Sequence, residues 1–220
     1  MNMMEDTNGK ETSATRTAYL ALREMILTGV LPAGQKLKIE QLRKILDTGA
    51  SPVREALSLL TSDMLVERID QRGFRAAPAS TENFEEILTL RCSLEEMAMR
   101  KSIEFSTPDW EERLVLAHHR MKQLKGSAAF EDAHKRFHMT LISSANSPML
   151  ERYCSQLYDL NIRYRNLAAG GASYKSRDIT SEHDDIFEAA IRRDGDAASA
   201  ALIDHYRLTG AYLAKQLSDL

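Results

Sequence analysis

The sequence predicts a mainly α-helical protein divided into two domains, and two observations carry this prediction. Residues 51–77 combine a short helical pattern with two strand-like segments around an Arg-Gly turn. From residue 79 onward, helical patterns continue to the C-terminus with no convincing strand between them. We therefore expect three segments: a disordered tail at 1–14, a mixed helix-and-hairpin domain at 15–78, and an all-helical domain at 79–220.

A helix beginning at Ser51 is the centre of the N-terminal domain. The Ser51 hydroxyl can cap the helix by accepting a backbone N–H, and Pro52 falls in the first turn, where its missing N–H costs nothing. Apolar residues then recur at helical spacing and form one buried face: Val53, Ala56, Leu57, Leu60 and Met64. Arg54 falls outside this face and is expected to point outward.

A β-hairpin with a basic tip is expected directly after this helix. Residues 65–70 alternate apolar and charged side chains, Gln71-Arg72-Gly73 supplies a turn, and residues 74–77 return. Two further helical patterns come earlier, one ending near Gly29 and one covering about 39–46. Helix, helix, helix, hairpin is the order of a winged helix-turn-helix, whose third helix lies in the major groove of DNA.

The same segments resemble a family of bacterial transcription regulators. The motifs are Tyr19-x-x-Leu22-Arg23-x-x-Ile26-x-x-Gly29, Leu31-Pro32-x-Gly34-x-x-Leu37, Pro52-Val53-Arg54-Glu55-Ala56-Leu57, Leu65-Val66 and Arg72-Gly73. They are similar to the N-terminal domain of the GntR family. The resemblance implies that the helix at 51–62 reads operator DNA, while Arg72-Gly73 enters the minor groove. The DNA-contacting residues that it implies are Ser51, Pro52, Arg54, Arg72 and Gly73.

One segment departs from the family pattern. The family usually carries Ser-Arg-Thr directly before Pro-Val-Arg, whereas this chain has Gly49, Ala50 and Ser51. The arginine that commonly contacts DNA is therefore absent at Ala50. Either Arg54, which can pair bidentately with guanine, and the hairpin carry more of the specificity, or the operator differs from the usual one.

The composition indicates a soluble, cytoplasmic protein without membrane contact. The 220 residues are 43% hydrophobic and 28% charged, and no run of about 18 apolar residues occurs. Cys92 and Cys154 lack metal-like spacing and are interpreted as reduced core thiols. The net charge of −3 is uneven: residues 1–78 hold 11 Lys and Arg against 10 Asp and Glu, and residues 79–220 hold 18 against 22. Phosphate attraction must then come from a local basic patch, presented twice by a dimer.

Six helical patterns make up the C-terminal domain. Thr81, Thr107-Pro108 and Ser147-Pro148 open the first, second and fourth, because Ser and Thr cap helices and Pro suits the first turn. The expected spans are about 81–98, 107–125, 128–144, 147–164, 178–192 and 196–217, with a loop at 168–176. A bundle of this size can enclose a ligand pocket.

Four of the six histidines fall on the later helices of this bundle. His134 and His138 are four residues apart, about 40° around a helix, so both rings can meet one ion. His183 and His205 lie on the last two helices. Neutral imidazole is a good ligand for zinc and nickel. An isolated pair with this spacing is nevertheless more often a surface or capping feature.

Further motifs resemble the FCD ligand-binding domain of FadR-type GntR regulators, in its shorter VanR-like form with six helices. They are Leu90-Arg91-x-x-Leu94-Glu95, Phe137-His138, Ala145-Asn146-Ser147-Pro148-x-Leu150, Glu182-His183-x-x-Ile186-x-x-Ala189, Gly195-Asp196-x-x-x-Ala200 and His205. The resemblance implies a divalent metal held by one aspartate and three histidines beneath a pocket for a small acid. His138, His183 and His205 match the three histidines, and His134 stands at the aspartate position.

The exchange of aspartate for His134 removes a negative charge from the implied site. Such a site should favour nitrogen-preferring ions, so we expect zinc or nickel rather than manganese or magnesium. Glu131 lies seven residues before His138, about 20° off its face, and could supply a carboxylate instead. A polar pocket without any metal is the remaining alternative.

Candidate effector-binding residues are Arg91, Tyr158 and Arg163. Arg91 is a cation in an otherwise apolar helical pattern, which is costly unless it is paired. It could clamp an effector carboxylate, or it could form an internal bridge to Glu95, four residues on. Tyr158 and Arg163 could face the pocket or flank it in solvent, and His118-His119 are interpreted as surface residues.

These features together predict a one-component transcriptional regulator. We expect it to bind a palindromic DNA operator as a homodimer and to respond to a small organic acid bound near the metal. A helical-bundle metalloenzyme is the first alternative, but the chain lacks both a second Glu-x-x-His and a His-Glu-x-x-His motif. A DNA-binding protein without an effector is the second. The effector, the operator and the sign of regulation do not follow from the sequence.

Overall fold

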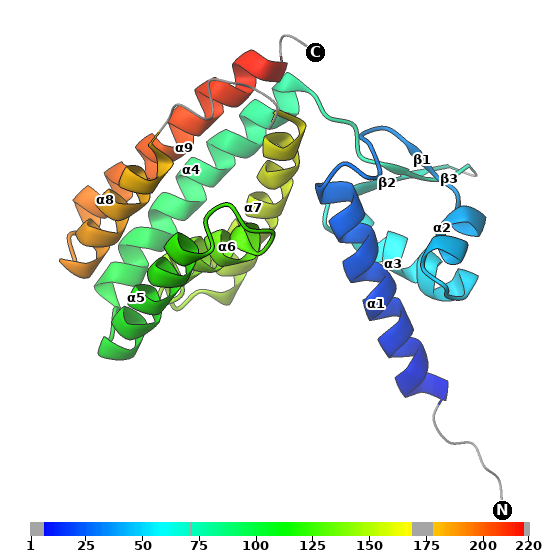
Figure 1. The fold of residues 1–220 in the computed structure, drawn as a ribbon, viewed down its shortest axis with the longest axis horizontal. Coiled ribbons are helices and arrows are strands. Elements are labelled where there is room, and N and C mark those ends of the chain that lie inside the picture. The colour runs from blue at the N-terminus through cyan, green and yellow to red at the C-terminus, as the bar shows by residue number, and fades with distance from the viewer. Residues whose placement is uncertain (1–6, 71, 169–177, 218–220) are drawn as a thin grey trace, which may run out of the picture. The chain divides into compact units, whose positions relative to one another are not determined.

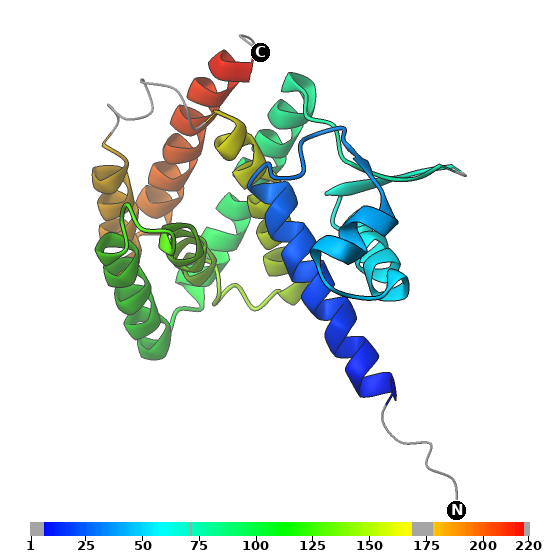
Figure 2. The same cartoon turned by 45° about the vertical axis from the view of Figure 1, so that its right-hand side comes forward.

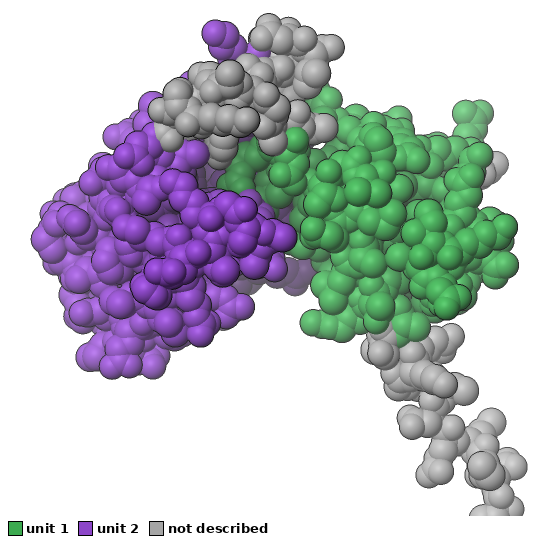
Figure 3. Space-filling view, in the orientation of Figure 1, with its two compact units in different colours: residues 1–80, 162–167 green, residues 81–161, 168–220 purple. Residues whose placement is uncertain are grey.

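The computed structural model describes residues 7–70, 72–168 and 178–217 (Figure 1). The chain forms two compact units, coloured separately in Figure 3. Unit 1 comprises residues 1–80 and 162–167, and unit 2 comprises residues 81–161 and 168–220. The loop expected at 168–176 lies outside the described residues, except for Ala168, which ends a helix.

Unit 1 has the element order of a winged helix-turn-helix. Its elements are α1 (Thr7–Leu27), β1 (Lys36–Leu37), α2 (Ile39–Ile45), α3 (Ala50–Ser62), β2 (Val66–Ile69) and β3 (Gly73–Ala76). Helix α3 packs against α1, and its apolar face is buried through Val53, Ala56, Leu57 and Leu60. The expected mainly helical fold, with a hairpin after the third helix, is confirmed.

Helix α1 begins earlier than the sequence pattern predicts. It starts at Thr7, so residues 7–14 of the expected disordered tail are helical. Leu22 and Ile26 anchor the later turns in the core, with 0% and 1% of their surface exposed. Once such a nucleus exists, each added residue contributes another hydrogen bond, and the helix can extend through polar sequence.

The start of α3 also differs from expectation. Gly49, with φ −72° and ψ 162°, occupies the N-cap position, and no side chain caps the helix. The Ser51 hydroxyl instead donates to Glu55 Oε1 at 3.3 Å. Pro52 does lie in the first turn, but its ring is buried. At the other end, Met64 adopts φ 60° and is 54% exposed, so it terminates the helical region rather than extending the apolar face.

The three strands form one antiparallel sheet in the order β1-β3-β2. In the predicted hairpin, Val66 pairs with Ala76 and Ile69 pairs with Gly73. The short strand β1, which the sequence pattern does not predict, pairs Leu37 with Phe74. Two residues carry too little periodicity to be recognised as a strand, so β1 depends on its pairing with β3.

The turn of the hairpin depends on a glycine. Gly73 has φ +94°, a backbone conformation that side chains with a Cβ rarely adopt. Gly73→Ala should therefore lower the free energy of unfolding of unit 1 by about 1 to 2 kcal/mol. Urea denaturation would measure this loss. Arg72→Ala, an exposed neighbour without that constraint, should stay within about 0.5 kcal/mol, and equal effects of the two changes would contradict the explanation.

Unit 2 is helical throughout its described residues. Its helices are α4 (Thr81–Glu104), α5 (Pro108–Gln123), α6 (Phe130–Leu141), α7 (Pro148–Ala168, of which 162–167 group with unit 1), α8 (Ile179–Ile191) and α9 (Gly195–Leu217). Helix α9 packs against both α4 and α8, and α5 packs against α6, as Figures 1 and 2 show from two directions. The six predicted helices are confirmed.

Local capping explains where several of these helices begin. Thr107 accepts a hydrogen bond from the Trp110 N–H at 3.2 Å, with Pro108 in the first turn of α5. Asp178 caps α8 by accepting from the Ser181 N–H at 3.1 Å. Trp110 itself is fully buried and donates its indole N–H to the Thr140 carbonyl at 2.8 Å. These contacts fix the frame that carries the histidines.

The two cysteines are free, and Cys154 lies in the core. Burial raises the pKa of the Cys154 thiol to about 12, so this thiol is protonated near neutral pH. Cys92 is half-buried, and burial also raises its pKa.

Candidate metal centre and nucleic-acid face

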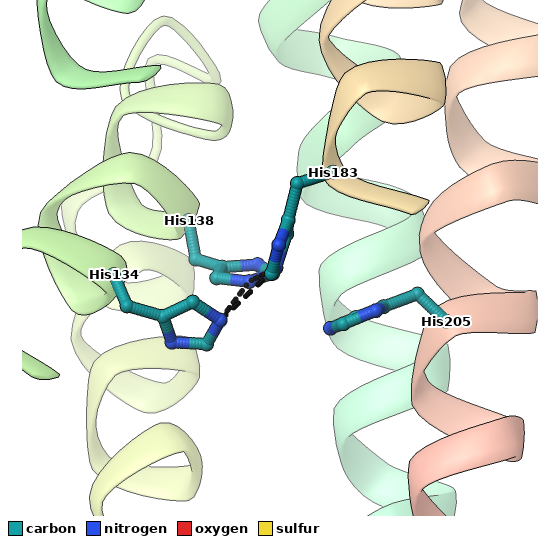
Figure 4. A group of neighbouring side chains, drawn as sticks. All are labelled: His134, His138, His183 and His205. Carbon is teal, nitrogen blue, oxygen red and sulfur yellow. Dashed lines mark hydrogen bonds between the residues drawn. The ribbon is translucent and has the colours of Figure 1, made fainter. Parts of the chain in front are cut away.

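Four histidines converge inside unit 2. His134 and His138 lie one turn apart on α6, His183 lies on α8 and His205 on α9 (Figure 4). All four are buried, and each offers a ring nitrogen within 4.8 Å of those of the other three. The Nε2 atom of His134 lies 3.0 Å from His183 Nε2 and 3.2 Å from His138 Nε2. The tertiary fold thus brings all four predicted ligands to one place.

Three of these rings contact a polar side chain through Nδ1, the ring nitrogen on the side away from the cluster. His134 Nδ1 lies 2.5 Å from the Tyr158 hydroxyl, His138 Nδ1 lies 3.0 Å from the Tyr206 hydroxyl, and His205 Nδ1 lies 2.7 Å from Glu182 Oε2. Metal-binding histidines are commonly oriented by a partner on the nitrogen that does not face the ion. The arrangement leaves Nε2 directed toward the centre of the cluster.

Both tyrosine hydroxyls donate a hydrogen bond to a carboxylate. The Tyr158 hydroxyl donates to Glu131 Oε1 at 2.7 Å, and the Tyr206 hydroxyl donates to Glu95 Oε2. Glu131 Oε1 is 3.7 Å from His134 Nδ1 and does not belong to the group of converging atoms. His134, rather than Glu131, therefore occupies the fourth position of the cluster.

Burial favours the neutral form of His138. Burial, followed by the neighbouring imidazoles and Arg91, holds the pKa of His138 well below its usual value. Burial likewise raises the pKa of Tyr206 well above its usual value, so its hydroxyl keeps its proton near neutral pH. Neutral imidazole is the form that binds metal ions. The residues present therefore fit a divalent transition metal.

Arg91 lies next to this cluster on α4. Its Nε donates to Glu95 Oε1 at 2.7 Å, so the internal bridge considered from the sequence does form. Its guanidinium carbon lies 3.9 Å from the ring centre of Tyr206 and 5.0 Å from that of Tyr158. Burial alone would lower the pKa of Arg91, but Glu95, Tyr206 and Tyr158 together outweigh burial and raise it. Arg91 Nη2 is buried and has no hydrogen-bond partner within the described part of the chain.

The other two effector candidates have different surroundings. Tyr158 is buried, with 1% exposure, between His134 and Glu131. Arg163 donates to the backbone carbonyl of Ala77 within unit 1. Its guanidinium is therefore engaged outside the histidine cluster, and effector binding by Arg163 stays a prediction.

His118 was expected at the surface but is buried, with only 9% exposure. Its ring stacks on Phe187 with centres 4.1 Å apart, and its Nε2 lies 2.8 Å from Asp184 Oδ1. Burial lowers the pKa of His118, although the hydrogen bond to Asp184 opposes this. The spacing of His118 from Leu114 and Met121 places it on the apolar face of α5, so helical periodicity could have revealed it.

The expected DNA-binding residues lie on two exposed parts of unit 1. Arg54 projects from α3, and its guanidinium makes no ion pair within the described residues. Arg72 and Gly73 are exposed at the hairpin turn. Ser51 is also exposed, whereas Pro52 is buried, and DNA contact by these two residues stays a prediction.

The carboxylate of Glu55 on the exposed face of α3 is also occupied. Thr15 donates to Glu55 Oε2 at 2.9 Å, while Ser51 donates to Oε1. Arg75 forms an ion pair with Glu67 at 2.6 Å, so the charge of Arg75 is partly neutralised. Among the residues predicted to contact DNA, Arg54 and Arg72 are the two cationic groups.

Known protein families match the sequences of both units. Residues 14–75 match the model for bacterial regulatory proteins of the gntR family, and residues 86–208 match the FCD domain. An uncharacterized HTH-type transcriptional regulator, BphR of Paraburkholderia xenovorans, is 33% identical over 88% of this chain and 82% of its own length. The HTH-type transcriptional repressor GlaR of Escherichia coli is 26% identical over 85% and 90%.

Solved structures show the same fold. The Escherichia coli protein McbR/YncC has a TM-score of 0.79 at 21% identity, over 92% of this chain and 98% of that one. A GntR regulator from Rhodococcus sp. RHA1 has a TM-score of 0.70 at 22% identity, over 92% and 97%. No helix in the described part of the chain has the length and apolar character needed to cross a membrane.

The fold and these matches define a transcriptional regulator rather than an enzyme. More specifically, the chain belongs to the GntR family and carries an FCD domain after its winged helix-turn-helix.

Proposed function

We propose that the protein binds a palindromic operator as a homodimer and responds to a small organic acid held near a divalent metal in unit 2. A two-fold symmetric protein with one reading helix per subunit matches a palindrome of two half-sites. In each subunit, Arg54 of α3 would contact base edges or phosphates in the major groove. Arg72 and Gly73 would approach the minor groove, and Ser51 would contact the backbone.

The metal would be held by His134, His138, His183 and His205, and zinc or nickel suits four neutral imidazoles. A bound ion would act as a Lewis acid toward an anionic effector. The relative GlaR is a repressor, which supports repression as the sign of regulation.

The observation that carries the effector proposal is the buried, unpartnered Nη2 of Arg91. A buried guanidinium N–H without an acceptor is costly, and a carboxylate is its natural partner. Arg91 lies over the Tyr206 ring, which contacts the metal-site residue His138. Tyr158, also beside Arg91, would line the same position. A small carboxylate could thus satisfy Arg91 close to the histidines.

The test is a screen of small mono- and dicarboxylates against full-length, zinc-loaded protein. A carboxylate at 100 times its Kd should stabilise the fold by about 2.7 kcal/mol, raising Tm by about 5 to 10 °C. Arg91→Gln should remove most of this response, whereas Arg100→Gln, an exposed change on the same helix, should not. A binder should also shift affinity for operator DNA recovered by selection from genomic fragments. If every carboxylate leaves Tm and DNA affinity unchanged, the protein acts on DNA without such an effector.

A further inference from the structure

His134 has two further side chains linked to it in series on the side away from the cluster. Its Nδ1 lies 2.5 Å from the Tyr158 hydroxyl, and that hydroxyl lies 2.7 Å from Glu131 Oε1. Tyr158 comes from α7, whereas His134 and Glu131 belong to the same helix, α6. The three groups form a relay from the cluster to a carboxylate that is about one-third exposed.

The relay determines which nitrogen of His134 carries the proton. A phenol has a single proton, and Tyr158 gives it to Glu131, because a carboxylate can only accept. The Tyr158 oxygen must then accept a proton from His134 Nδ1. A neutral imidazole has one N–H, so His134 Nε2 is left with a lone pair that faces the cluster.

The same reasoning applies to the neighbouring ligand. The Tyr206 hydroxyl donates its proton to Glu95, so the Tyr206 oxygen accepts a hydrogen bond from His138 Nδ1. His138 Nε2 therefore also carries a lone pair rather than a proton. His134 Nε2 and His138 Nε2 are only 3.2 Å apart. Unless a proton on His183 Nε2, which lies 3.0 Å and 3.3 Å from these atoms, is shared between them, two lone pairs at this separation repel each other in a buried site of low dielectric constant. A cation coordinated by both nitrogens removes this repulsion.

We propose that Tyr158 and Glu131 are positioning residues for His134, which direct its Nε2 toward the metal ion. The inference rests on the metal site proposed above and specifies its selectivity. The negative charge of Glu131 raises the basicity of His134 through Tyr158, while the group that meets the ion remains a neutral nitrogen. The site therefore selects zinc, nickel or cobalt, and disfavours manganese and magnesium, which prefer oxygen ligands.

The experiment measures metal affinity of full-length, metal-free protein, prepared without a polyhistidine tag. Zinc, cobalt and manganese are titrated at a fixed pH of about 7.5, in competition with a chromophoric chelator. Tyr158→Phe should weaken zinc binding about 10- to 100-fold, because Nδ1 loses its oriented acceptor. Glu131→Gln keeps an acceptor for the Tyr158 hydroxyl but loses the charge, so its loss should be smaller.

Tyr153→Phe is the matched control. Tyr153 lies on the same helix as Tyr158 but is 50% exposed, so loss of its hydroxyl should leave zinc affinity within about twofold of wild type. A second variant tests selectivity directly: His134→Asp places a carboxylate in the cluster and should lower the ratio of zinc to manganese affinity by about tenfold or more.

The outcomes separate the two proposals. If wild type binds none of the transition metals, the metal site itself is refuted. If wild type binds zinc but both Tyr158→Phe and Glu131→Gln bind it equally well, the site stands and the relay is refuted. Circular dichroism of each variant establishes that it is folded, so that a loss of affinity reports on the site.

Discussion

Substituting His183 with alanine should abolish stoichiometric metal binding. His183 Nε2 lies 3.0 Å from His134 Nε2 and 3.3 Å from His138 Nε2, and the ring is 2% exposed. It is the contribution of α8 to a cluster that otherwise comes from α6 and α9. Since alanine supplies no donor atom, a water molecule would have to replace a buried nitrogen. We expect zinc affinity to fall by at least about 100-fold.

The loss of zinc affinity in His183→Ala should also reduce the stabilisation of the fold by zinc. Zinc at 100 times the wild-type Kd should stabilise wild type by about 2.7 kcal/mol, and this increment should fall to about 0.4 kcal/mol or less in His183→Ala. Thermal unfolding with and without zinc, together with elemental analysis, measures both effects. His119→Ala is the control, because His119 lies on α5 and is exposed. Full zinc content and an unchanged zinc-dependent Tm in His183→Ala would refute the proposed ligand set.

Arg54→Ala should remove most of the selective affinity for operator DNA. Arg54 is exposed on α3 and makes no ion pair within the described residues, while the nearby carboxylate of Glu55 is held by Thr15 and Ser51. The arginine usual in the family is replaced by Ala50, which leaves Arg54 as the main candidate on this helix for pairing with guanine. Losing one bidentate contact should reduce the preference for the operator over random DNA about 5- to 150-fold.

Gel-shift titrations at several salt concentrations distinguish the roles that Arg54 could have. Loss of a base contact lowers the preference for the operator, whereas loss of a phosphate contact weakens all DNA similarly and reduces the salt slope by about one. Lys101→Ala removes the same charge from an exposed position on α4 and should change neither quantity. If Arg54→Ala binds the operator as selectively as wild type, α3 does not read DNA through this residue.

The order of helices and the hairpin could be predicted because local chemistry specifies them. Thr107-Pro108 and Asp178 act as start signals within their own first turns, and Leu114 and Met121 mark the apolar face of α5. Elements stabilised mainly by distant partners were missed or misplaced. The two-residue strand β1 exists through its pairing with β3, and the first turns of α1 extend a helix that is anchored elsewhere.

Burial of polar groups was the least predictable property. His118 was expected in solvent because it lies in a charged helix beside Arg120 and Lys122, yet Phe187 and Asp184 from another helix cover it. Its neighbours in sequence could not indicate this, because the covering residues lie more than 60 positions away. The same reason applies to Arg163, whose partner is a backbone carbonyl of Ala77.

The sequence by itself determined the two-domain helical architecture, the family and the four histidines, because helical periodicity, caps and short motifs are local properties of the chain. Only the tertiary structure decided how those histidines face one another and what stands behind them. Tyr158 and Tyr206 each contact one imidazole at Nδ1. Arg91 donates from Nε to Glu95, while its buried Nη2 has no hydrogen-bond partner among the described residues. Such relations depend on the packing of separate helices to within an ångström, which spacing along a single helix cannot specify.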